Sequence, residues 1–237
     1  MIRNIKALGL ALVAVLAMSA VAASASQAAT SGFDVGLSPA VLKGTILPGT
    51  EHTLVVGTAV VKCAEANIEG TVAGTVAEPK NVHEATATAT YAKCKFGGTA
   101  AEVRMNGCKY TLTDTLTSLT AEVDITGCTS GKWIEIISLV TNCSITVKEQ
   151  GPLSHVVGEN VVGTSPTHVV LNATVKNIHA IFDGSECPGT GEVANAEFNG
   201  KTTVKAFKDD GTEAEKEEFK HKFLPLKAIT QTSLEAT

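Results

Sequence analysis

The chain has 237 residues, a formal net charge of −5 and only 4% aromatic residues. A chain of this length can bury enough surface to fold as one large β domain or two small ones. The mildly acidic charge argues against nucleic acid as a partner, because a nucleic-acid-binding face needs clustered lysine and arginine. The scarcity of flat rings also argues against a broad carbohydrate-stacking surface.

Residues 1–28 have the three regions of a secretory signal peptide. Arg3 and Lys6 supply the basic start, residues 7–17 form an apolar stretch, and small residues then offer cleavage sites after Ala25 or Ala28. The apolar stretch is about half of the ~20 residues that a membrane-spanning helix needs, so we expect cleavage and no transmembrane anchor afterwards. No cysteine lies near the cleavage site, so we expect no lipid anchor. The mature chain is predicted to be secreted and extracellular, either released or held at the cell surface without a covalent bond.

Alternating apolar and polar residues predict one β-strand after another along the mature chain. The runs with this period lie at 84–91, 101–106, 109–113, 119–126, 143–147 and 169–175. Ile178, Ala180 and Phe182 continue the last run with the opposite parity, which predicts a bulge near Asn177. The pattern predicts an all-β fold, either an antiparallel β-sandwich or a partly closed barrel, over residues 29–208. Two tandem domains with a boundary near residue 151 are the alternative.

Six cysteines, an even number in a chain expected to enter an oxidising compartment, predict three disulfides. They are Cys63, Cys94, Cys108, Cys128, Cys143 and Cys187. The short loops between them favour Cys94–Cys108 and Cys128–Cys143, which leaves Cys63–Cys187 as a long clamp. The competing scheme pairs Cys63 with Cys94. No C-x-x-C pair is present, so we predict neither a metal site nor a cofactor.

The segment 209–237 differs from the rest in its charge pattern. Thr212 and Glu215 fit a capping box, acidic residues precede basic ones, and Pro225 follows. The segment is predicted to form a short helix at 212–222 or to be a disordered tail.

Several short motifs resemble those of a group of uncharacterised secreted proteins from actinobacteria. The motifs are Tyr91-x-x-Cys94, Asn106-Gly107-Cys108-x-Tyr110 and the run Cys143-Ser-Ile-Thr-Val147. The resemblance spans roughly residues 63–200. It implies a cysteine-containing, β-rich, secreted domain and no particular activity.

The sequence contains no catalytic motif of the G-x-S-x-G, H-E-x-x-H or S-x-x-K type, and its histidines are scattered. We therefore predict no catalytic residue and favour a non-enzymatic extracellular or cell-surface module, structural or adhesive. A carbohydrate or small-ligand binding protein is the alternative, followed by a hydrolase whose site is assembled only by the fold. The candidate ligand-binding residues are Trp133, Tyr110 and Tyr91. Each lies next to a cysteine-bearing strand, where core packing against a disulfide is the competing interpretation.

Overall fold

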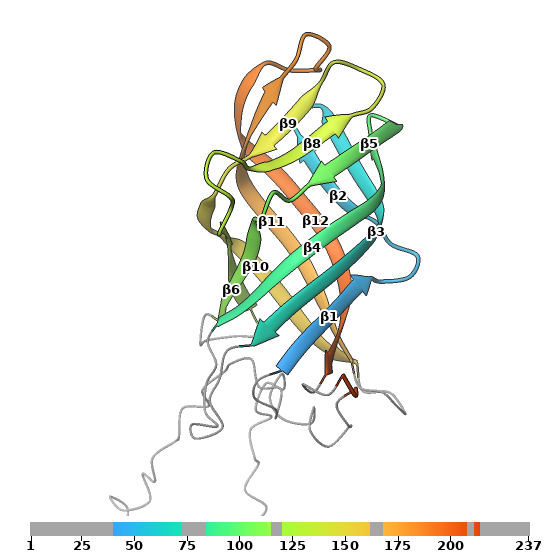
Figure 1. Ribbon diagram of the computed structural model, residues 1–237, viewed down its shortest axis with the longest axis vertical. Helices are drawn as coiled ribbons and strands as arrows, with labels where there is room; N and C mark the ends of the chain where they lie inside the picture. Colours follow the sequence, from blue (N-terminus) through green and yellow to red (C-terminus); the bar gives the residue numbers. More distant parts are fainter. Residues whose placement is uncertain (1–39, 73–83, 115–119, 162–167, 208–210, 214–237) are drawn as a thin grey trace, which may run out of the picture. The chain divides into compact units, whose positions relative to one another are not determined.

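The computed structural model describes residues 40–72, 84–114, 120–161, 168–207 and 211–213, and these residues form twelve β-strands with no α-helix. All the strands belong to one antiparallel sheet (Figure 1). The strands are β1 (Ala40–Ile46), β2 (His52–Val56), β3 (Ala59–Val72), β4 (Glu84–Phe96), β5 (Thr99–Arg104), β6 (Lys109–Asp114), β7 (Thr120–Thr126), β8 (Ile134–Ser138), β9 (Ser144–Val147), β10 (Gln150–Val161), β11 (His168–Asp183) and β12 (Gly191–Phe207).

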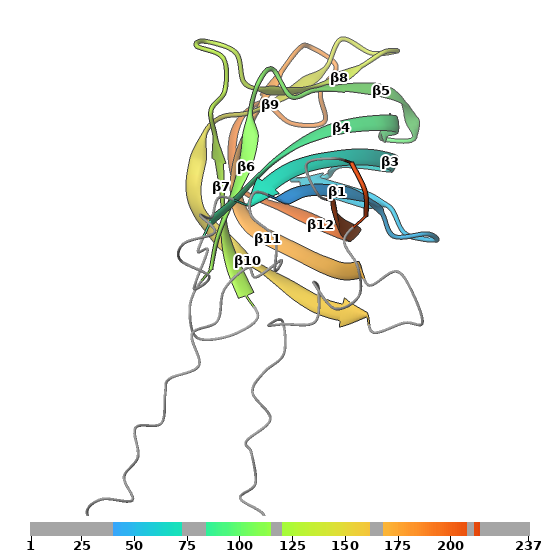
Figure 2. The same ribbon diagram turned by 60° about the horizontal axis from the view of Figure 1, so that its bottom comes forward.

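The strand pairings close the sheet on itself twice. One ring runs β1–β3–β4–β6–β7–β10–β11–β12 and returns to β1. The other runs β2–β3–β4–β5–β8–β9–β11–β12 and returns to β2. The long strands β3, β4, β11 and β12 belong to both rings, so the sheet is an eight-stranded barrel at either level. Figure 2 shows the strands curving round a common interior.

The predicted alternation decides which side chains face that interior. In β7, Ala121, Val123 and Ile125 are buried while the residues between them are half-buried. The expected bulge in β11 is confirmed, because the pairing with β12 shifts register after Val175 and Asn177 has a φ of 58°. The all-β prediction is therefore confirmed, and the two rings extend the partly closed barrel to full closure. The boundary considered near residue 151 falls inside β10, whose neighbours belong to the same sheet.

Three disulfides use all six cysteines, but not in the predicted pairs. The bonds are Cys63–Cys94, Cys108–Cys128 and Cys143–Cys187. The predictions Cys94–Cys108, Cys128–Cys143 and Cys63–Cys187 are therefore wrong, and the competing pair Cys63–Cys94 is correct.

Strand register explains the correct pairs. Cys63 lies directly opposite Cys94 where β3 pairs with β4, and Cys108 and Cys128 lie just beyond the pair Lys109 and Thr126 at one end of the β6–β7 hairpin. The mistaken scheme assigned the cysteines to the wrong strand pairs, because it joined the cysteines nearest in sequence instead of those at the open ends of the β3–β4 and β6–β7 hairpins.

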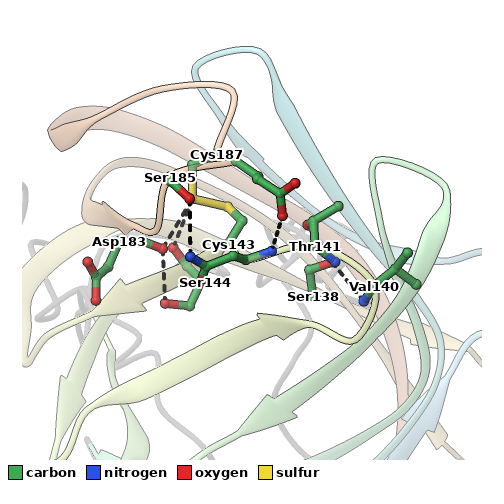
Figure 3. The surroundings of a disulfide bond; sticks show 10 residues. Ser138, Val140, Thr141, Cys143, Ser144, Asp183, Ser185 and Cys187 are labelled. Atoms are coloured by element: carbon green, nitrogen blue, oxygen red, sulfur yellow. Dashed lines mark hydrogen bonds between the residues drawn. A yellow bond between two sulfur atoms is a disulfide. The ribbon is translucent and has the colours of Figure 1, made fainter.

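The Cys143–Cys187 bond ties the β8–β9 turn to the β11–β12 connection, and hydrogen bonds surround it (Figure 3). The Asn142 amide donates to the Glu186 carboxylate at 2.6 Å, and the Glu186 amide donates to the Asn142 carbonyl at 3.2 Å. Ser138 Oγ accepts from the Thr141 amide and hydroxyl within the same turn. The turn is thus fixed at both its base and its tip.

Several predictions lie outside the described residues. They include the signal peptide at 1–28, Leu119, and all but the first residues of the helix considered at 212–222. Within the described part, Glu213 forms a β-bridge with Phe207. Among the described residues there is no helix with the length and apolar character needed to cross a membrane.

Candidate functional site

One end of the barrel interior is filled by large, fully enclosed side chains. This filled end lies at four connections between strands. They are 57–58 between β2 and β3, 97–98 between β4 and β5, 139–143 between β8 and β9, and 184–190 between β11 and β12. Val56 and Ile145 have no exposed surface, and Phe96 and Phe182 are only 7% and 6% exposed. These residues pack in one buried cluster. The filled end therefore closes one side of the interior.

Below the filled end the interior contains a cavity of about 180 Å³. Its wall includes side chains from every strand except β1, and 19 of the 24 wall residues have purely hydrocarbon or phenylalanine side chains. The wall residues Leu171, Leu112 and Phe198 are half-buried, although they pack against the core cluster. An apolar wall of this kind favours apolar contents, because burying an unpartnered polar group there would cost free energy.

Small side chains on the inward face of the barrel explain why it is hollow. The sequence of β4 alternates alanine and threonine, and Ala87 is a wall residue between the buried Ala85 and Ala89. On β11, Ala173 is also in the wall. An eight-stranded barrel is just wide enough to be filled by ordinary side chains or to hold one small ligand. Because alanine is too small to fill the interior at these positions, the barrel is left hollow at this level.

His52, on β2, is the most distinctive polar residue of the cavity wall. It is 4% exposed, and its Nε2 lies 3.3 Å from the Lys201 carbonyl and 3.1 Å from the Thr202 hydroxyl. Its ring makes edge-to-face contacts with Tyr91 and Phe198. Burial lowers the pKa of the imidazole, against the opposing effect of the hydrogen bond to the Lys201 carbonyl. His52 is therefore neutral at neutral pH.

The contacts of His52 assign its proton. A carbonyl oxygen can only accept, so the Nε2 atom facing Lys201 must carry the hydrogen. Nδ1 is then a bare acceptor, and it has no hydrogen-bond partner although it is shielded from solvent. Buried polar atoms are usually paired, so an orphaned acceptor in a cavity wall calls for an explanation.

Tyr91 and Tyr110 form the second polar group of the wall. Their hydroxyls lie 3.2 Å apart, and the Tyr110 hydroxyl donates to Met105 Sδ at 3.9 Å. Tyr91 must then donate to Tyr110, since the hydrogen of Tyr110 is already used. Burial raises the pKa of both phenols, in Tyr91 together with its charge interaction and hydrogen bond with Tyr110. Both phenols are neutral at physiological pH and have partners.

The structure separates the three aromatic residues singled out in the sequence. Tyr91 and Tyr110 belong to the cavity wall, whereas Trp133 does not. The Trp133 side chain is half-buried and its carbonyl accepts a hydrogen bond of 2.7 Å from Asn106 Nδ2. Sequence reasoning missed His52. The alternation of residues in β2 was the available signal for this residue, because His52 lies on the same inward face as Leu54 and Val56.

The described residues contain no group of three or more histidine, cysteine, aspartate or glutamate side chains placed to hold a metal ion. The wall side chains that are neither hydrocarbon nor phenylalanine are those of His52, Cys63, Tyr91, Tyr110 and Thr202.

No protein-family model, curated protein or solved structure matches the chain. The resemblance to secreted actinobacterial proteins therefore stays a prediction. The three disulfides and the absence of free cysteines among the described residues are consistent with an extracellular or secreted protein.

Proposed function

We propose that this protein is a secreted, non-enzymatic binding protein that takes up one small, uncharged, predominantly apolar molecule inside its barrel. The observation that carries the proposal is the cavity of about 180 Å³ with 19 purely apolar wall residues. The barrel is already closed by hydrogen bonds between its strands, so its stability does not require an internal void. Each void instead removes contacts that would otherwise hold the core together.

The size of the cavity restricts the ligand. An engineered protein cavity of about 150 Å³ with similar walls stays dry and binds benzene. A cavity of about 180 Å³ therefore suits a molecule of one aromatic or alicyclic ring with small substituents. A sugar is disfavoured, because each of its hydroxyls would need a partner that the hydrocarbon wall does not supply.

The charge of the wall restricts the ligand further. Of the wall residues, His52 alone can carry a charge near neutral pH, and burial lowers its pKa. A carboxylate or an ammonium group in the cavity would lose its hydration with no opposite charge to replace it. The ligand is therefore neutral when bound.

Calorimetric titration of the secreted protein with toluene tests this proposal. We expect saturable binding, because toluene matches the wall in polarity and the cavity in size. Ala173→Phe puts a ring into the cavity and should weaken binding roughly tenfold or more. Thr174→Phe is the matched control, because Thr174 is the exposed neighbour of Ala173 on the same strand, and it should bind toluene like the unchanged protein.

Two results would contradict the proposal. One is no binding of toluene by the folded protein. The other is equal binding by the Ala173→Phe and Thr174→Phe variants, which would place the bound molecule outside the barrel.

A structural or adhesive role is a second candidate, and the Cys143–Cys187 turn supports it. Leu139 and Val140 are 61% and 69% exposed in this turn, which the disulfide and the Asn142–Glu186 hydrogen bonds hold in place (Figure 3). Replacing both residues with serine leaves the cavity untouched. Loss of surface adhesion in that variant, with toluene binding retained, would favour the adhesive role over the binding role.

A further inference from the structure

We propose that the ligand carries one O–H or N–H group that donates a hydrogen bond to Nδ1 of His52. This inference rests on the proposed function, and it narrows the ligand from any small apolar molecule to a phenol-like one. The observation behind it is an unpaired acceptor in a wall whose other polar side chains are all paired.

The other polar wall residues satisfy one another. The hydroxyls of Tyr91 and Tyr110 are bonded in series and end on the sulfur of Met105. The Thr202 hydroxyl is bonded to His52 Nε2. Among the described wall residues, His52 Nδ1 is the buried side-chain polar atom that has no hydrogen-bond partner at all. Leaving such an acceptor buried without a partner is unfavourable relative to pairing it.

The orientation of the ring turns Nδ1 away from β12. The Cδ2–Nε2 edge lies against the backbone of β12, so closely that a Cβ built on Gly200 would be 2.7 Å from Cδ2 and 3.0 Å from Nε2. Nδ1 belongs to the opposite side of the imidazole. Histidine occupies a broad χ2 well, so a small tilt of the ring uncovers Nδ1 to an atom in the cavity.

The glycine at 200 indicates that this placement is built into the strand. Any other residue there would collide with His52 and with Phe198, whose Cζ would lie 3.0 Å from the added Cβ. The absence of a side chain at Gly200 thus lets the imidazole sit in contact with β12, with Nε2 held and Nδ1 free.

Phenol and toluene provide the test, because they have nearly the same shape and differ in one donor. We expect the secreted protein to bind phenol about tenfold more tightly than toluene, the ratio of one buried hydrogen bond. His52→Phe keeps a ring and removes the acceptor, so it should bind both molecules with equal affinity. Thr174→Val is the control, because Thr174 is exposed on β11 and is not a wall residue, and it should keep the preference.

Each outcome separates this inference from the proposed function. Equal binding of phenol and toluene by the unchanged protein would overturn the role of His52 and leave the proposed function standing. Failure to bind either molecule would overturn both. A phenol preference that survives in His52→Phe would assign the acceptor to another residue and overturn the inference.

A spectroscopic readout covers the case in which His52→Phe does not fold. In the unchanged protein with ¹⁵N-labelled histidine, phenol should shift the Nδ1 resonance of His52 in the direction of a hydrogen-bonded nitrogen, and toluene should not. No difference between the two ligands at that resonance would contradict the proposal.

Discussion

The filled end and the cavity occupy the same barrel, yet they are built from different side chains. At the filled end Phe96, Phe182 and Ile145 belong to one buried cluster, and their exposed fractions are 7%, 6% and 0%. At the level of the cavity, the small residues Ala87 and Ala173 are in the wall, and the larger wall residues Leu112, Leu171 and Phe198 are only half-buried. Strand number and hydrogen bonding are the same at both levels. The comparison teaches that residue volume on the inward face, rather than the architecture, decides whether such a barrel is solid or hollow.

The largest difference between the two regions should appear in their response to truncation. Ile145→Ala removes a fully enclosed side chain from the filled end and should lower the free energy of unfolding by about 3–5 kcal/mol. Leu171→Ala enlarges an existing cavity and should cost about half as much, because part of that side chain already has no neighbour. Urea denaturation of the two variants measures both values. Equal losses would mean that the cavity is filled in solution.

An intermediate effect is expected at the contact between β12 and His52. Gly200→Ala forces the imidazole or the Phe198 ring to move and should cost about 1–3 kcal/mol of folding free energy. The same substitution made in a His52→Ala background should cost clearly less, because one of the two clashing rings is gone. Thermal denaturation of the four proteins in this cycle measures the coupling. Additive losses would show that the ring does not press against β12.

The smallest effect concerns pH. The folded pKa of His52 is below its unfolded value of about 6.5, because burial disfavours the charged ring. Below about pH 6.5 the imidazole of the unfolded chain therefore binds a proton more readily than that of the folded chain. Folding stability decreases as the pH falls through this range. Between pH 7.5 and 5.5 this contribution is at most about 1.4 kcal/mol.

Urea denaturation at both pH values checks the effect, with His52→Phe as the control that lacks this ionisation. If the unchanged protein and His52→Phe lose the same stability on acidification, His52 is not the group responsible.

Much of the barrel could be predicted from local sequence, because strand parity is a local property. The inward face of β7 and the bulge at Asn177 follow from the spacing of apolar residues alone. The disulfide pairs could not be predicted, since they depend on which strands pair. Cys63 and Cys94 meet through the register of β3 and β4, 31 residues apart in sequence.

The cavity was equally hidden from the sequence. Its volume depends on side chains from eleven strands that share a level only after the barrel closes. His52 was overlooked for a related reason. His52 shares its parity with Leu54 and Val56, but Val55 is apolar on the other face, so alternation alone does not decide which face of β2 is inward; only the closed sheet places His52 beside Tyr91 and Phe198.

Methyl NMR during a toluene titration tests the central claim, that the hollow level of the barrel is a ligand site, most directly. We predict that the methyl resonances of Ile68, Leu112 and Leu171 in the cavity wall shift with toluene concentration, while those of Val56 and Ile145 at the filled end do not. Shifts confined to the exposed Leu139 and Val140, or no shifts at all, would contradict the account.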